Sequence, residues 1–191
     1  MWKELLYSDT ILSLPRAKRV AYIGVVTALT VVCNAMLEIK LGGVQFSLTI
    51  LTSVLAGLII GAAPGFLACF MGDALGFLMH PYGEYSPAIG ISTGLMAVYA
   101  AIVMRVLPAK TKWGTYAKLA LVCALIFWCC TVAINNDYLH RVYYSSMTFW
   151  ECLNTRLFLQ GQIVNTLVNS ALVVFLIPAL AKIKPLKLKI Q

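Results

Sequence analysis

The most restrictive feature of this sequence is a run of about 32 residues without a charge, from Leu41 to Gly72. A single helix needs only about 20 apolar residues to cross a bilayer, so this run is too long for one span. It contains one helix-breaking segment, Gly-Ala-Ala-Pro-Gly at residues 61–65. Glycine is typical after the end of a helix and proline in the first turn of the next. The run therefore predicts two consecutive spans, at about residues 46–61 and 64–79.

The composition supports a membrane protein throughout. Hydrophobic residues make up 61% of the 191 positions, charged residues only 12%, and the mean hydropathy is +0.85. Basic residues precede the first long apolar run, which we interpret as a retained helix rather than a cleaved signal. The net charge of +8 comes from residues between the apolar segments and not from a basic face with aromatics, so we expect no nucleic-acid partner. We predict a single domain over residues 1–191.

Four further apolar segments complete the predicted spans, at about residues 20–37, 88–106, 117–134 and 157–181. The fold class predicted is therefore an all-α integral membrane protein with six transmembrane helices. The polar connection between the last two spans, residues 135–155, is the longest. Six spans place both termini on the same side of the membrane.

The distribution of Lys and Arg predicts the orientation. The six-span arrangement places 12 of the 15 basic residues on the side of the termini and 3 on the other. Cytoplasmic loops carry the excess of Lys and Arg, so both termini are predicted to be cytoplasmic. The expected location is the bacterial plasma membrane, with multiple passes through the lipid bilayer.

Polar residues that could form a site concentrate on the outer side. They occur at the end of the first span, in the loop at residues 80–87, and between residues 137 and 160. Arg156 and Gln160 are four positions apart and share a helix face; the arginine is expected to contact an anionic ligand or to pair with Glu151 or Glu84. Asp73, in the middle of an apolar run, is interpreted as either a site residue or a helix-packing group.

Two other polar residues lie deep in the last span. Asn165 and Asn169 are expected either to contact a ligand or only to join helices by hydrogen bonds. The chain has no P-loop, HExxH or GxSxG motif, and its six cysteines show no CxxC spacing. We therefore expect no catalytic residues, metal site or cofactor.

Several short motifs occur in an order that resembles one transporter family. Asp73, Leu75 and Gly76 resemble a D-x-L-G element, and Pro81, Gly83, Tyr85 and Pro87 a P-x-G-x-Y-x-P element that follows it. Gly24 and Ala28 are similar to an AxxxA element in the first helix, and Arg156 with Gln160 to an Arg–Gln pair on the last. With six spans in about 190 residues, the chain resembles the S components, or substrate-binding subunits, of energy-coupling factor (ECF) vitamin transporters, especially the folate group.

The resemblance implies a function. An S component binds one vitamin at the outer face and delivers it with a transmembrane coupling subunit and two ATPase subunits. Folate, with a flat pterin and a carboxylate tail, is the first expectation; pantothenate, riboflavin and a queuosine precursor are alternatives. A membrane enzyme using Asp73, Glu84 and His80, or a structural assembly protein, remains the competing interpretation.

The candidate residues fall into two sets. Those expected to bind the ligand are Asn34, Glu38, Lys40, Asp73, Tyr82, Tyr85, Trp150, Arg156 and Gln160. Those expected to contact the coupling subunit are Ala21, Gly24 and Ala28, because small residues one turn apart let two helix backbones approach closely in lipid.

Overall fold

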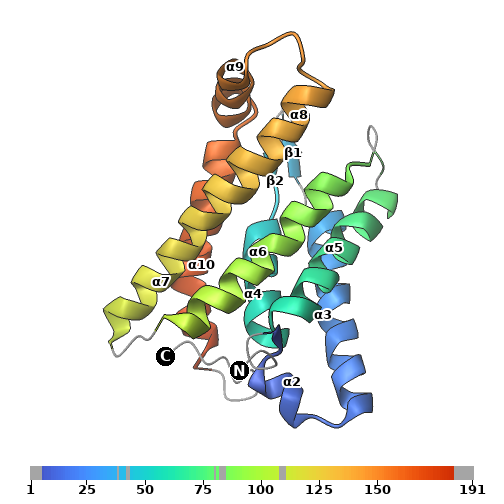
Figure 1. Ribbon diagram of the computed structural model, residues 1–191, viewed down its shortest axis with the longest axis vertical. Helices are drawn as coiled ribbons and strands as arrows, with labels where there is room; N and C mark the ends of the chain where they lie inside the picture. The colour runs from blue at the N-terminus through green and yellow to red at the C-terminus, as the bar shows by residue number, and fades with distance from the viewer. Residues whose placement is uncertain are drawn as a thin grey trace.

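A computed structural model describes residues 6–37, 39–41, 44–79, 81, 85–107 and 111–182, without the side chains of residues 36, 39–41, 44 and 45 (Figure 1). Two short strands pair in an antiparallel hairpin, β1 (Ile39–Leu41) and β2 (Val44–Phe46). All other regular structure in these residues is helical. The helices are α2 (Asp9–Ser13), α3 (Arg16–Met36), α4 (Thr49–Ile60), α5 (Ala62–Met79), α6 (Pro87–Val106), α7 (Lys112–Leu125), η1 (Ile126–Asn136), α8 (Asp137–Val142), α9 (Phe149–Asn154), η2 (Thr155–Leu159) and α10 (Gln162–Leu180).

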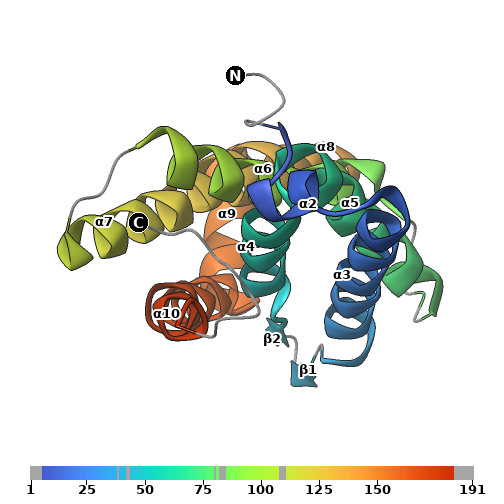
Figure 2. The same ribbon diagram turned by 90° about the horizontal axis from the view of Figure 1, so that it is seen from below.

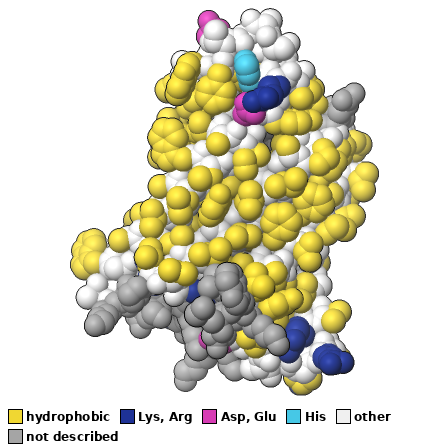
Figure 3. Space-filling model, viewed as in Figure 1, with side chains coloured by type: hydrophobic (Ala, Val, Ile, Leu, Met, Phe, Trp, Pro, Cys, Tyr) yellow, Lys and Arg dark blue, Asp and Glu magenta, His cyan; other side chains and the backbone are white. Residues whose placement is uncertain are grey.

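Five helical segments are long and apolar enough to cross a membrane, and α4 is a shorter apolar helix among them. The predicted all-α membrane class is therefore confirmed. The five are Arg16–Ala35, Ala62–Met79, Pro87–Val106, Lys112–Val142 and Gln162–Leu180. In the view of Figure 3, hydrophobic side chains cover the middle of the surface and charged ones lie near its two ends, as expected for a protein surrounded by lipid.

Helix α4 is the central element of the bundle. It begins at Thr49 rather than near residue 46, because β2 occupies Val44–Phe46. Its 12 residues measure about 18 Å at 1.5 Å per residue, less than the hydrocarbon thickness of a bilayer. It is surrounded by protein: it packs against α3, α5, α6 and α10, and Figure 2 shows it between α10 and α3. A side chain at Gly57 would overlap the backbone carbonyl of Ala97 on α6, which explains the close approach of these two helices.

The break between α4 and α5 lies at Gly61, as the sequence indicates. Gly61 has a φ of 102°, a conformation that residues with a side chain rarely adopt. A Cβ there would also lie 2.6 Å from the backbone nitrogen of Ser8. The amino-terminal segment covers this turn through Ser8. The Ser8 hydroxyl donates to the Ile59 carbonyl at 2.7 Å, and the Ser8 amide donates to the Ile60 carbonyl at 3.2 Å. Ile11 of α2 is fully buried.

The fourth long helix, which corresponds to the fifth predicted span, extends beyond the end expected for it. The sequence predicts a connection from residue 135 onward, but the helix continues through η1 and α8 to Val142. No glycine or proline occurs between Gly114 and Gly161, so nothing in the sequence terminates the helix there. The η1 segment has π-helical hydrogen bonding, and its last residue, Asn136, is completely buried.

Candidate functional site

The predicted outer-side elements gather at one end of the bundle. The hairpin, α8, α9 and the adjoining ends of α5 and α6 lie at the top of Figure 1, whereas α2 and the carboxyl end of α10 lie at the bottom. Among the candidates, Glu38, Tyr82 and the side chain of Lys40 lie outside the described residues. The remaining candidates form three separate polar groups.

The first group surrounds Arg156 in η2. Arg156 is only 8% exposed, and its guanidinium Nη1 donates to the Oδ1 of Asn136 at 3.4 Å, a long hydrogen bond. Asn136 donates in turn to the carbonyl of Phe149, also at 3.4 Å. Within the described parts of the chain, no carboxylate lies within ion-pair distance of Arg156. A buried guanidinium with one weak neutral partner is suited to binding an anion.

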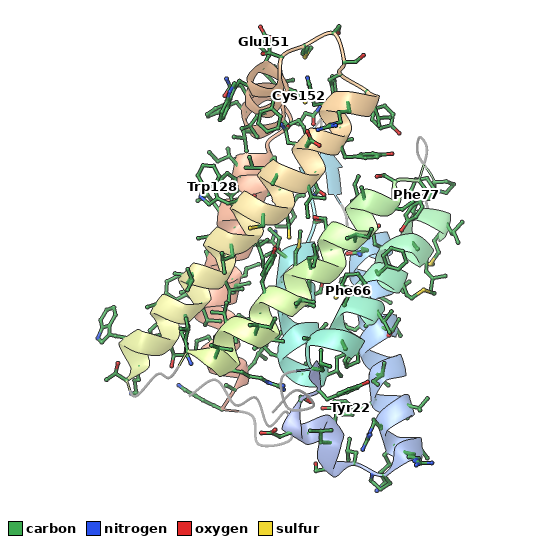
Figure 4. All side chains as sticks on the ribbon, viewed as in Figure 1. Tyr22, Phe66, Phe77, Trp128, Glu151 and Cys152 are labelled. Carbon is green, nitrogen blue, oxygen red and sulfur yellow. The ribbon has the colours of Figure 1, made fainter. Side chains whose placement is uncertain are left out.

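The acids near this group are engaged elsewhere. Glu151 forms a capping box with Thr148: its carboxylate accepts from the Thr148 amide at 2.8 Å and from its hydroxyl at 2.9 Å. These hydrogen bonds lower the pKa of Glu151. Asp137 pairs with Arg141 at 2.9 Å. The expected alternative in which Glu151 neutralises Arg156 is therefore not observed; Figure 4 shows Glu151 at the tip of this end of the molecule.

Gln160 and Trp150 flank the same region. The Gln160 amide donates to the Tyr144 hydroxyl at 3.0 Å. Trp150 is 67% exposed and packs edge-to-face on Phe149, with ring centroids 5.5 Å apart. Cys152 of α9 is buried, and this burial raises the pKa of its thiol.

The second group brings Asp73 and Tyr85 together. The Tyr85 ring packs on Phe77, with centroids 5.3 Å apart. A Cβ at Gly90 would lie 2.6 Å from the Tyr85 hydroxyl, so the glycine makes room for it. Burial raises the pKa of Tyr85, and the nearby charge of Asp73 raises it further. Asp73 raises this pKa both through its charge and through a side-chain hydrogen bond, so the two side chains lie close together.

The third group, which we call the asparagine cluster, consists of Asn34, Ser47, Thr49, Asn165 and Asn169. Asn169 donates to the Ser47 carbonyl at 2.7 Å, and Asn165 Oδ1 accepts from the Ser47 amide at 3.2 Å. The two asparagines also bond to each other at 2.9 Å. From the other side, Asn34 accepts from the Thr49 hydroxyl at 3.0 Å. Asn165 and Asn169 therefore join helices, as one of the two interpretations expected.

Asn136, Ser47 and Thr49 take part in these groups but are not among the candidates predicted from the sequence. Asn136 falls in the predicted polar connection, whereas in the structure it is the last residue of η1. Ser47 takes part through its backbone, which leaves no sequence signal. The one sequence feature that could have pointed to Asn136 as a buried polar residue is its position directly after a long apolar run.

The predicted docking residues lie on an open face of α3. Ala21, Gly24 and Ala28 are all exposed, and a Cβ placed on Gly24 would meet nothing within 4 Å. Their neighbours Val20 and Val25 are 71% and 69% exposed. Within the described residues, this small-residue stripe is therefore not packed against another helix of the chain.

The described residues contain no group of three or more metal-ligating side chains. The three groups offer hydrogen-bond donors, acceptors and one buried positive charge, which are means of binding a polar ligand.

Comparisons with known proteins agree with this assessment. A family model described as "ECF-type riboflavin transporter, S component" matches residues 15–184. No curated protein matches the sequence. A solved structure described as "Crystal structure of FolT bound with folic acid" is similar in fold, with a TM-score of 0.64 and 16% identity, over 82% of this chain and 87% of that one.

Proposed function

The chain belongs to the family of ECF-type riboflavin transporter S components, and from this premise we propose that it binds an anionic vitamin, with folate as the first candidate, at the end of the bundle formed by the hairpin, α8 and α9. S components are multi-pass, non-enzymatic, substrate-binding subunits of transporters. The competing interpretations as a membrane enzyme or an assembly protein are set aside.

The observation that carries the proposal is the environment of Arg156. A buried cation is costly unless it is compensated, and its one partner in the described residues is the amide of Asn136 at 3.4 Å. A ligand carboxylate would supply two charge-assisted hydrogen bonds and the missing negative charge. Gln160, Tyr144 and the exposed Trp150 surround the same region and offer polar and stacking contacts.

The charge of the ligand distinguishes the two candidate vitamins. Riboflavin, which the family description names, is uncharged at neutral pH and would leave the guanidinium uncompensated. Folic acid, which is bound in the FolT structure, combines a flat ring system with a carboxylate tail. Charge therefore favours folate, and riboflavin is the second candidate. The likeness to FolT, at 16% identity, supports the fold alone.

The proposal extends to a partner. The open face of α3 at Ala21, Gly24 and Ala28 would receive a helix of the coupling subunit, which two ATPase subunits would drive. By the positive-inside rule, this face belongs to the cytoplasmic half of α3. Small residues at such a face allow the close backbone contact on which helix association in lipid depends.

The test is to purify the protein in mild detergent and identify any co-purified small molecule by mass spectrometry, and then to titrate folic acid and riboflavin separately. Saturable binding of folic acid, tighter than that of riboflavin, is the expected result. Tighter riboflavin binding would refute the charge argument and leave the S-component function intact; binding of no vitamin would refute both.

A further inference from the structure

We propose that Asn165 and Asn169 hold the base of hairpin β1–β2 and thereby set how fast a ligand leaves the outer end of the bundle. This inference rests on the proposed function for its second half only. The anchoring itself is a property of the ligand-free protein, and it is tested there first.

The first observation is where the asparagines bond. Ser47 directly follows Phe46, the last residue of β2. Both backbone groups of Ser47 are bound by the last long helix: its amide by Asn165 at 3.2 Å and its carbonyl by Asn169 at 2.7 Å. A residue bonded at both groups is fixed in position and in orientation, so the hairpin leaves the bundle from a defined point.

The second observation is that Asn169 also bonds to the first turn of α4, where a capping side chain is missing. Leu48, the N-cap of α4, makes no side-chain capping bond, although the first amides of a helix need partners. Asn169 supplies one: its Oδ1 accepts from the Leu51 amide at 3.3 Å. The Asn169 side chain therefore bonds on both sides of the junction between β2 and α4.

The third observation is burial. Asn169 is 0% exposed and Asn165 is 7% exposed. Hydrogen bonds without competing water are costly to break, because the released groups remain unsatisfied. From the opposite side, Asn34 of α3 holds Thr49 at 3.0 Å. The junction is therefore bound by two helices that lie on either side of α4 (Figure 2).

The hairpin beyond this junction is lightly held by comparison. Its strands have three residue pairs, from Ile39 with Phe46 to Leu41 with Val44. A two-stranded hairpin of this length is not stable by itself in water, so its position depends on its ends and on the packing of β2 against α10. Loosening the Ser47 anchor would therefore increase opening of the hairpin and leave the rest of the bundle unchanged.

The experiment compares Asn165→Ala with wild type by hydrogen exchange of the ligand-free protein in detergent. Asn154→Ala, the same change at an exposed position of α9, is the matched control. We expect exchange at residues 44–51 to rise about tenfold in Asn165→Ala, because its loss releases the Ser47 amide and one Asn169 donor. Exchange in α6 should stay within about twofold. Asn165→Asp, which keeps the acceptor oxygen, should restore protection.

The second readout is the dissociation rate of folic acid, or of riboflavin if that is the vitamin bound. We expect it to rise about tenfold in Asn165→Ala with little change in the association rate, and to be unchanged in Asn154→Ala.

Three outcomes would overturn the inference. Unchanged exchange at residues 44–51 refutes the anchor, and equal increases in every helix mean that the asparagines only stabilise the fold. Faster exchange with an unchanged dissociation rate refutes the link to release. If wild type binds neither vitamin, the proposed function fails separately, and the exchange result still decides whether the anchor exists.

Discussion

Replacing Arg156 by glutamine should affect the ligand-bound and ligand-free proteins differently. Glutamine keeps a donor near Asn136 and most of the apolar stem, but removes the buried charge. A charge-assisted hydrogen bond contributes on the order of 1.5–3 kcal/mol, so the dissociation constant for folic acid should rise about tenfold to about 100-fold. An exposed arginine offers the matched control: the side chain of Arg141 is 74% exposed and already paired with Asp137.

The ligand-free protein should lose little or no stability. Arg156 gives up one hydrogen bond of 3.4 Å, while the cost of keeping an uncompensated cation away from water disappears with it. An arginine that held the fold together would instead lower the melting temperature of the ligand-free protein.

Thermal unfolding with and without folic acid measures both effects. At a ligand concentration of about 100 times the dissociation constant, binding stabilises the folded state by about 2.7 kcal/mol. A loss of about 30-fold in affinity reduces this stabilisation to below about 1 kcal/mol at the same concentration. Arg141→Gln should keep the full effect. The reasoning is wrong if Arg156→Gln binds folic acid within twofold of wild type, or if its ligand-free form melts several degrees lower.

Three further predictions concern other parts of the chain. Gly24→Trp should abolish vitamin uptake in cells that carry the coupling module, while the purified protein still binds ligand. Leu78→Trp, at a 71% exposed position of α5, is the control. Parallel loss of binding and uptake in Gly24→Trp would contradict docking at α3. Gly61→Ala should lower the melting temperature by at least about 3 °C, because its φ of 102° costs of order 1–3 kcal/mol with a side chain; Gly24→Ala, in open space, should not. Because its hydrogen bonds lower the pKa of Glu151, the cap of α9 is present above the ordinary pKa of a glutamate and is lost as the pH falls through the lowered value. Hydrogen exchange in α9 should therefore differ between wild type and Glu151→Gln at neutral pH and converge in acid; a constant difference would contradict this.

Most of the fold was predictable, because the signals for it are local. Gly61 and Pro64 divide one long apolar run into two helices, and the structure places the break at that glycine. The continuation of the fourth long helix beyond residue 134 was not predicted, since Asn135, Asn136 and Asp137 indicate a loop by polarity. Polarity does not end a helix when its residues are helix-compatible and a buried partner, here the backbone of Phe149, satisfies one of them.

The candidate site was predictable only in part. Arg156 and Gln160 were expected to share a helix face, and in the structure they bond to Asn136 and Tyr144, respectively. The neighbours Asn136 and Tyr144 come from the end of η1 and from the turn after α8. They lie about 20 and 12 positions earlier in the chain than Arg156, a separation that no local pattern encodes. The role of Asn165 and Asn169 depends on the backbone of Ser47, whose side-chain type carries no information about it.

The contact between Ser8 and the turn at Gly61 has a consequence for the order of events during synthesis. The Ser8 hydroxyl and the Ile59 carbonyl that it binds are separated by 51 positions. Translation proceeds at about 5–20 residues per second, so several seconds pass between the appearance of the two groups. During that interval α3 is complete, whereas the helical pair α4–α5 is not. The Ser8 hydroxyl therefore gains this partner only after α4 has been synthesised, so closure of the amino-terminal segment over the turn comes later than the synthesis of α3.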